Sequence, residues 1–226
     1  MNAAPPEERV AAMFDRVVDR YDLVNTLLSM GLDARWRREA AQQVPSLPGD
    51  RVLDLGCGTG KLGELLASRA HVVGADISER MLEAARRQRG DRMRVVRASA
   101  FAIPFADGAF RGAVSGFVLR NLNDLPAAFA ELARVLAPGG AIALVDITGP
   151  RGGLLRRPFD AYFSAMAPLL GRLTGDAGAY RYLARSLAQL PPPGRVREML
   201  DAAGFERTDA RPLTGGMVTL WTGVRA

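Results

Sequence analysis

The sequence has almost none of the residues that usually carry metal or thiol chemistry. Its 226 residues include one cysteine, Cys57, and one histidine, His71. A single cysteine excludes an internal disulfide, and no cysteine–histidine cluster is available to bind a metal. No base accompanies Cys57, so we expect it to pack rather than act as a nucleophile. The low cysteine content suits a reducing compartment.

Long apolar runs are missing as well. No run approaches the roughly 20 residues that a helix needs to cross a bilayer. Residues 1–9 lack the apolar centre and cleavage site of a signal peptide. Hydrophobic residues make up 48% of the chain and charged residues 24%, which is ordinary for a globular protein. We therefore expect a soluble, cytoplasmic protein.

Lysine is nearly absent. Lys61 is the only one, so the formal net charge of +6 is carried almost wholly by arginine. A basic balance can indicate nucleic acid, an anionic membrane or acidic ligands, and it can equally reflect solubility and a GC-rich genome. Lysine-rich patches with interleaved aromatics, and an Asn-Pro-Pro-Tyr-like base pocket, are both missing. We expect no nucleic-acid partner.

Short apolar strands alternate with helices from residue 51 onwards. The predicted strands are 51–55, 71–76, 93–98, 113–117 and 141–146, with helices at 60–68, 79–89 and 126–136; a helix at 196–203 and antiparallel strands at 205–210 and 217–224 follow. This order predicts parallel βαβ units with right-handed crossovers. The expected fold is α/β, a Rossmann-like doubly wound sheet of seven mostly parallel strands.

The chain length suits one domain, within which four regions differ in pattern. Helical periodicity over 10–45 predicts an N-terminal helical cap, and 46–150 form the Rossmann-like core. Residues 151–192 are predicted to be a helical lid insertion, and 193–226 supply the last helix and antiparallel strands. The lid carries an apolar stripe of Phe159, Phe163, Met166 and Leu170, which could line a tunnel or belong to an ordinary core.

The strand at 51–55 runs into a glycine-rich turn at Gly56–Gly60. Glycines permit the sharp turn and let a ligand approach the backbone, at the edge where doubly wound folds bind ligands. Asp54 precedes the first glycine by two residues; its carboxylate would attract a cationic amino-acid ligand and repel a pyrophosphate. Residues 58–63 also match the dinucleotide pattern, but that match begins after the turn has started. The turn therefore favours S-adenosylmethionine over NAD.

Two further segments extend this ligand site. Asp76 ends the second predicted strand, where a carboxylate can bind both ribose hydroxyls. Its alternative role is to cap the next helix, for which Ser78 is better placed. After the third strand, Ala98–Phe105 is expected to border the adenine; Ser99 can hydrogen-bond to the base, and Phe101 can stack on it or simply pack. The predicted cofactor-binding residues are Asp54, Gly56, Gly58, Gly60, Asp76, Ile77, Ser99, Ala100 and Phe117.

Several motifs outside the glycine turn resemble one family. They are Phe14–Val17, Tyr21–Asn25, Leu28-Ser29, Trp36–Arg38, Gly116–Asn121, Gly175-Asp176, Ala179–Leu183 and Arg211–Val218. Over about residues 10 to 224 the chain resembles the ubiquinone/menaquinone-biosynthesis C-methyltransferases (UbiE/MenG type), which are class I methyltransferases. The resemblance implies methyl transfer from S-adenosylmethionine to a ring carbon of a polyprenylated quinol. It leaves open a peripheral contact with the inner face of the membrane, and a homo-oligomer.

The resemblance also directs attention to the acceptor side of the site. A ring carbon is nucleophilic only when the neighbouring hydroxyl is ionised or nearly so, and no histidine is placed to take the proton. We expect Arg120 to stabilise the phenolate or orient a water, Asn121 to fix the ring, and Tyr21 to close over the sulfonium. The alternatives are a salt bridge from Arg120 that holds the lid and plain helix packing for Tyr21.

The chain departs from the family pattern at four positions. Asp33 stands where a histidine is common, Ser99 replaces an acid or amide, Arg185 replaces a glutamate, and Asp146 replaces a glutamate. Because the glycine turn, Asp76 and Arg120 are untouched, the class survives and the substrate is less defined. Three alternatives stay open: a methyltransferase of another small molecule, a nucleic-acid methyltransferase, and a binding module without catalysis.

Overall fold

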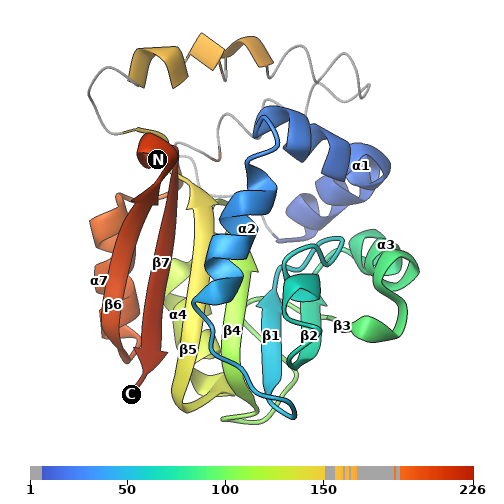
Figure 1. Cartoon of the computed structure of the whole chain (residues 1–226), viewed down its shortest axis with the longest axis vertical. Helices are drawn as coiled ribbons and strands as arrows, with labels where there is room; N and C mark the ends of the chain where they lie inside the picture. Colours follow the sequence, from blue (N-terminus) through green and yellow to red (C-terminus); the bar gives the residue numbers. More distant parts are fainter. Residues whose placement is uncertain (1–6, 151–155, 160, 163, 167–185, 187–188) are drawn as a thin grey trace.

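The computed structural model describes residues 7–150, 156–159, 161–162, 164–166, 186 and 189–226, and it contains a seven-stranded sheet (Figure 1). The strands are β1 (Arg51–Leu55), β2 (His71–Asp76), β3 (Arg94–Arg97), β4 (Phe110–Gly116), β5 (Leu136–Ile147), β6 (Phe205–Leu213) and β7 (Val218–Arg225). Their order is β3-β2-β1-β4-β5-β7-β6. The first five are parallel, whereas β7 runs antiparallel to both β5 and β6. The predicted fold class is confirmed.

Helices cover both faces of this sheet. They are α1 (Glu7–Leu28), α2 (Asp33–Gln42), α3 (Glu79–Arg89), α4 (Leu125–Val135) and α7 (Pro193–Ala202), with 3₁₀ turns η1 (Gly63–Leu65), η2 (Gly90–Arg92), η3 (Leu119–Asn121) and η4 (Thr214–Gly216). Along β1 the side chain of Val52 belongs to the core on the α2 side, and Leu53 to the core on the α4 and α7 side. Both residues are fully buried, which explains why the strand reads as a continuous apolar run.

The carboxyl ends of β1 and β4, at Leu55 and Gly116, lie next to each other in the sheet although they are far apart along the chain. Here the strand order reverses, because β2 continues the sheet on one side of β1 and β4 on the other. Such a reversal leaves a crevice beyond the strand ends, where doubly wound folds bind ligands. Figure 1 shows α1 beyond this edge of the sheet, above β1 and β2.

Helix α1 is attached to the core mainly through α3. The hydroxyl of Ser78 donates to the carboxylate of Asp15, and Arg80 donates to the backbone carbonyl of Asp15 over 2.7 Å. Val18 of α1 packs in a small apolar cluster with Met81 of α3. These contacts fix α1 against one wall of the crevice and leave its middle face turned toward the cavity described below.

One predicted helix and two predicted element boundaries are wrong. A helix was expected at 60–68, but only the 3₁₀ turn η1 forms, because the amide of Gly63 donates to the side chain of Asp54 instead of continuing a helix. Strand β5 begins at Leu136, where a helix was expected to end, and β6 runs on to Leu213, where a linker was expected. In both places strand pairing overrides the local turn signal of proline and glycine.

Much of the predicted lid falls outside the described residues. This applies to Phe163, Leu170, Gly175-Asp176, Ala179–Leu183 and Arg185. The described stretches within 156–166 are helical, and the hydroxyl of Tyr162 donates to the carbonyls of Leu27 and Leu28 at 3.1 and 3.2 Å. Tyr162 thus adds side-chain hydrogen bonds to carbonyls in the last turn of α1, where the helical hydrogen-bond pattern ends. No helix of the described residues is long and apolar enough to cross a bilayer.

Candidate functional site

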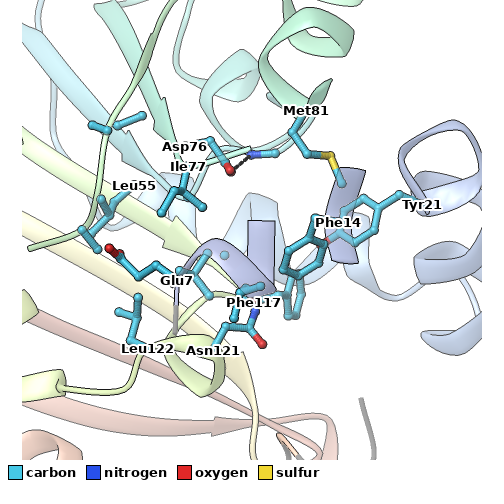
Figure 2. Close-up of a pocket in the computed structure, with 18 residues that line it drawn as sticks. Glu7, Phe14, Tyr21, Leu55, Asp76, Ile77, Met81, Phe117, Asn121 and Leu122 are labelled. Atoms are coloured by element: carbon cyan, nitrogen blue, oxygen red, sulfur yellow. Dashed lines mark hydrogen bonds between the residues drawn. The ribbon is translucent and has the colours of Figure 1, made fainter. Parts of the chain in front are cut away.

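A cavity that opens to solvent lies between α1 and the carboxyl edge of the sheet (Figure 2). Helix α1 contributes Glu7, Val10, Phe14 and Tyr21, which recur at helical spacing along one face. The sheet side is lined by Leu55, Gly56, Gly58, Ala75, Asp76, Ile77, Met81, Ala98, Ala100, Gly116, Phe117, Val118, Asn121 and Leu122.

The glycine turn after β1 lies tightly against its neighbours. The amides of Gly56 and Cys57 both donate to the carbonyl of Ala75, at 2.7 and 3.0 Å. Gly56 has a φ of 66°, and a Cβ atom on it would lie 2.3 Å from the side chain of Val118. A side chain at this position would therefore clash, as the sequence predicts. Gly56 and Gly58 line the cavity, whereas a Cβ on Gly60 would meet Arg89 instead.

Asp76 is positioned by backbone amides at the end of β2. One carboxylate oxygen accepts from the amide of Gly58 at 2.8 Å, and the other accepts from the amide of Ser78 at 2.9 Å. Burial raises the pKa of Asp76, while these hydrogen bonds lower it. The helix cap of α3 is Ser78, whose hydroxyl accepts from the amide of Met81 at 3.1 Å. The carboxylate keeps acceptor capacity toward the cavity, which suits a ribose diol.

Asp54 carries an unsatisfied carboxylate oxygen. One oxygen accepts from the amide of Gly63 at 2.8 Å; the other is buried and has no hydrogen-bond partner among the described residues. Burial raises the pKa of Asp54 to about 7, against the lowering effects of the Gly63 hydrogen bond and the nearby charge of Arg37. An orphaned buried acceptor calls for a donor, ideally a cationic one.

Asp54 also lines a small polar cavity beside the glycine turn. Its walls are Tyr21, Asp22, Arg37, Asp54, Gly56, Cys57, Gly58, Thr59, Lys61, Leu62 and Gly116. Asp22 accepts from the hydroxyl of Thr59 at 3.0 Å and pairs with Lys61 at 3.4 Å. The buried Arg37 pairs with Asp33 and stacks over Phe117 at 4.8 Å. Asp54 could bind an ammonium group, and Arg37 and Lys61 could bind a carboxylate. The cavity therefore fits the amino-acid end of S-adenosylmethionine.

The predicted adenine loop approaches the cavity at its other end. Ala98 and Ala100 line the cavity, as does Ile77. The hydroxyl of Ser99 accepts from the amide of Phe101 at 3.1 Å and donates to the carboxylate of Glu7. Phe101 is partly buried against the core on the α4 side, so the packing alternative holds for it.

A buried ion pair joins the turn η3, which follows β4, to the end of β5. The guanidinium of Arg120 donates to the carboxylate of Asp146, whose second oxygen accepts from the Arg120 amide at 3.1 Å. Only 5% of the Arg120 side chain and none of the Asp146 side chain is exposed. The Nε of Arg120 has no hydrogen-bond acceptor in the described part of the chain. Arg120 therefore forms an ion pair with the end of β5; most of the predicted lid, to which a salt bridge was the expected alternative, lies outside the described residues.

Tyr21 lies where the two cavities meet. Its ring packs edge-on against Phe14, with 5.6 Å between centroids, and its hydroxyl interacts with Asn25. Burial raises the pKa of Tyr21, whereas the charge of Arg120 lowers it, so the guanidinium acts on this hydroxyl. Asn121 lines the larger cavity near Phe117 and Leu122 (Figure 2).

The remaining sequence predictions concern residues outside the chemistry. Burial raises the pKa of Cys57 well above its usual value, in agreement with a packing role. His71 is exposed at the amino end of β2, opposite the cavity edge. Among the described residues no cluster of histidine, cysteine and carboxylates could bind a metal. Sequence reasoning missed Glu7 and Lys61 as cavity residues, and it treated Arg37 only as part of a motif.

Comparison with known proteins gives a consistent result. The family model of the ubiE/COQ5 methyltransferase family matches residues 3–225. A demethylmenaquinone methyltransferase of Clavibacter sepedonicus is 43% identical over 96% of this chain and 90% of its own length. The ubiquinone/menaquinone biosynthesis C-methyltransferase UbiE of Teredinibacter turnerae is 36% identical over 100% and 95%. A solved SAM-dependent methyltransferase from Thermotoga maritima has a TM-score of 0.67 at 18% identity, covering 96% of this chain and 99% of its own.

Proposed function

This chain belongs to the ubiE/COQ5 methyltransferase family, and we propose that its acceptor is the ring carbon of demethylmenaquinol. It is an S-adenosylmethionine-dependent C-methyltransferase of quinone biosynthesis, acting on a prenylated quinol. The choice of menaquinone rests on the relatives: the one named for demethylmenaquinone is 43% identical, against 36% for the one named for both quinones. A methyltransferase of an unrelated small molecule is not favoured.

The single observation that carries the cofactor assignment concerns Asp54, which lines a polar cavity beside the glycine turn and has a buried carboxylate oxygen without a partner among the described residues. When bound, S-adenosylmethionine supplies a methyl group activated by its sulfonium. In our proposal Asp54 accepts from its ammonium group, and Arg37 and Lys61 attract its carboxylate. Asp76 accepts from the ribose hydroxyls, and the apolar wall of Ile77, Ala98, Ala100 and Leu122 contacts the base.

On the acceptor side, the quinol hydroxyl must lose its proton as the ring carbon attacks. Of the carboxylates considered as a base, Asp33 already accepts from Ser29 and Arg37, and Asp146 is paired with Arg120. A raised pKa keeps Tyr21 protonated at neutral pH, so it serves as a donor rather than a base. We assign stabilisation of the phenolate to Arg120, orientation of the ring to Asn121, and release of the proton to water.

A membrane contact is the second part of the proposal, because a polyprenylated substrate resides in the bilayer. Leu23 and Leu27, one turn apart on α1, are 61% and 45% exposed, and Met30, just past the end of the helix, is 60% exposed. We propose that this apolar ridge rests on the inner face of the membrane. Replacing Leu23 and Leu27 by serine should reduce sedimentation with anionic vesicles, whereas Leu47→Ser, at an even more exposed leucine elsewhere, should not.

The direct test of the proposed function is methyl transfer from labelled S-adenosylmethionine to chemically reduced demethylmenaquinone. We expect one labelled methyl group on the quinone ring, located by mass spectrometry, and no product from the oxidised quinone, whose ring carbon is not nucleophilic. The benzoquinol precursor of ubiquinone serves as the competing acceptor. Methylation of that precursor alone would reverse the choice of quinone, and a lack of product from either would remove the proposal.

A further inference from the structure

The large cavity has a polar end and an apolar end. Beyond Asp76 its walls are Ile77, Ala98, Ala100 and Leu122, which suit a flat base but offer it no side-chain hydrogen bond. One charged side chain interrupts this apolar end: Glu7, the first residue of α1 (Figure 2). In Figure 2 its carboxylate lies among Leu55, Ile77 and Leu122, on the opposite side of the cavity from Tyr21.

A hydrogen bond from Ser99 positions the carboxylate of Glu7. The serine hydroxyl lies 2.8 Å from each carboxylate oxygen of Glu7, and the same hydroxyl accepts from the amide of Phe101. The only hydroxyl hydrogen of Ser99 is therefore used by Glu7, and Ser99 does not itself line the cavity. One hydroxyl hydrogen satisfies little of a carboxylate, which has about four acceptor sites. Among the described residues no lysine or arginine forms an ion pair with Glu7.

We propose that Glu7 is a specificity-determining residue that accepts a hydrogen bond from the 6-amino group of the adenine. This inference rests on the proposed function, since it assumes that the base of the cofactor occupies the apolar end. The amine is the only part of adenine's edge that offers hydrogens, and a carboxylate is a strong acceptor for it. A base with a carbonyl at the same position would place two acceptors face to face and be rejected.

The contact between Glu7 and Ser99 gives α1 a role in recognising the adenine as well as in covering the cavity. Glu7 is 92 residues from Ser99 in sequence, so the helix that closes the cavity also brings in the acceptor. Recognition of the adenine and closure of α1 over the cofactor then occur together, because the Glu7 carboxylate reaches the cavity only when α1 lies across it. Val10 and Phe14, one and two turns further along, cover the middle of the same cavity.

The test compares the binding of two ligands, S-adenosylhomocysteine and its inosine analogue, in which a carbonyl replaces the amine. We expect wild-type protein to prefer the adenine ligand by about tenfold or more, the usual loss when a buried polar group is left unpaired. Glu7→Gln should bring the two affinities close together, since the amide can turn its donor toward the carbonyl. The readout is calorimetric affinity, independent of catalysis.

Glu8→Gln is the matched control, because Glu8 lies in the same helical turn, carries the same charge and is exposed. It should leave the preference unchanged. A rescue variant moves the carboxylate across the contact: Glu7→Ser combined with Ser99→Asp should restore the preference.

Two failures can be told apart. If Glu7 only attaches α1 to Ser99, Glu7→Gln will weaken both ligands equally and keep their ratio, which overturns the inference. If wild-type protein binds neither ligand, the cofactor assignment fails instead. Circular dichroism of each variant confirms that α1 is still formed, so a loss of binding through unfolding is recognised.

Discussion

The amide of Gly63 donates a 2.8 Å hydrogen bond to one oxygen of the Asp54 carboxylate, and the other oxygen has no partner in the described structure. The bond uses the Gly63 amide, so only a 3₁₀ turn follows the glycine turn, and Asp54 lines the small polar cavity beside it. With 1% of the residue exposed, the charged form is poorly solvated and the pKa rises to about 7. A cationic ligand would reverse this penalty.

The first prediction is that the affinity for S-adenosylhomocysteine rises between pH 6 and pH 8. Below about pH 7 the Asp54 carboxyl is protonated in the free protein and must release its proton to meet the ligand's ammonium. Above that pH the carboxylate is already charged, so the affinity levels off. Calorimetry across this range should give up to about a tenfold increase per pH unit below pH 7, with proton release detected in buffers of different ionisation enthalpy.

Asp54→Asn is the control for this pH dependence. It should flatten the profile and weaken binding at pH 8. It should also change stability, with the opposite sign to a salt-bridged acid: the pKa of Asp54 is higher in the folded than in the unfolded protein. Its contribution is therefore greatest below about pH 4 and is lost as pH rises to 7, by up to about 1.4 kcal/mol per unit. A profile unchanged in Asp54→Asn would point to Asp76 as the titrating group.

Asp76 gives the second prediction. Asp76→Ala should weaken S-adenosylhomocysteine by about 1–3 kcal/mol, since charge-assisted hydrogen bonds to the ribose are lost. NAD titrated in parallel should not bind tightly to either protein, because Asp54 disfavours a pyrophosphate beside the glycine turn. Tight NAD binding without S-adenosylhomocysteine binding would end the methyltransferase assignment. Ser78→Ala, which removes the cap of α3, is the comparison for a purely structural loss.

The third prediction concerns the motion of α1. In the free protein, amides of α1 should exchange faster than those of β1 and β4, because α1 covers the cavity rather than forming the main core. Saturating S-adenosylhomocysteine should slow exchange in α1 selectively. Hydrogen exchange followed by mass spectrometry resolves the two regions; equal protection in both states would make α1 fixed structure.

Much of this fold was predictable because its signals are local. The apolar strands, the glycine turn and the helix cap at Ser78 follow from periodicity and residue type, and each is present. The failures lie where a distant contact decides. The helix expected at 60–68 is prevented by Asp54, and the C-terminal strands extend past their turn signals through pairing with each other.

The site residues at the strand ends could be predicted from the sequence, whereas the contribution of Glu7 on α1 could not. Residues at strand ends are placed by the sheet, so Asp54 and Asp76 could be assigned from order alone. Glu7 reaches the adenine loop through a contact that no spacing in the sequence reveals. The family resemblance did point to some residues that are distant in sequence and close in the fold. Trp36 donates to Thr214 over 2.8 Å, and these two residues belong to family motifs and lie 178 positions apart.

The last prediction separates chemistry from structure at Arg120. Arg120→Ala leaves the fully buried Asp146 without its cation and should reduce stability by about 3–5 kcal/mol. It should also lower kcat by about a hundredfold or more, if the guanidinium stabilises the phenolate in the transition state. Affinity for S-adenosylhomocysteine should change little, since the cofactor contacts other residues. Arg120→Lys should recover only part of the rate, because a point charge does not reproduce the planar fork.

Stability and rate can be uncoupled by removing both members of the pair. In a variant with Arg120→Leu and Asp146→Leu no charge is left buried, so most of the lost stability should return. If Arg120 acts on the acceptor, kcat with demethylmenaquinol stays low in this variant even though the protein is folded and binds S-adenosylhomocysteine. Recovery of near-normal kcat together with stability would make Arg120 a structural residue only, since an apolar pair would then serve the reaction as well. Because thermal melting and turnover are measured on the same preparations, each outcome assigns the ion pair to one role.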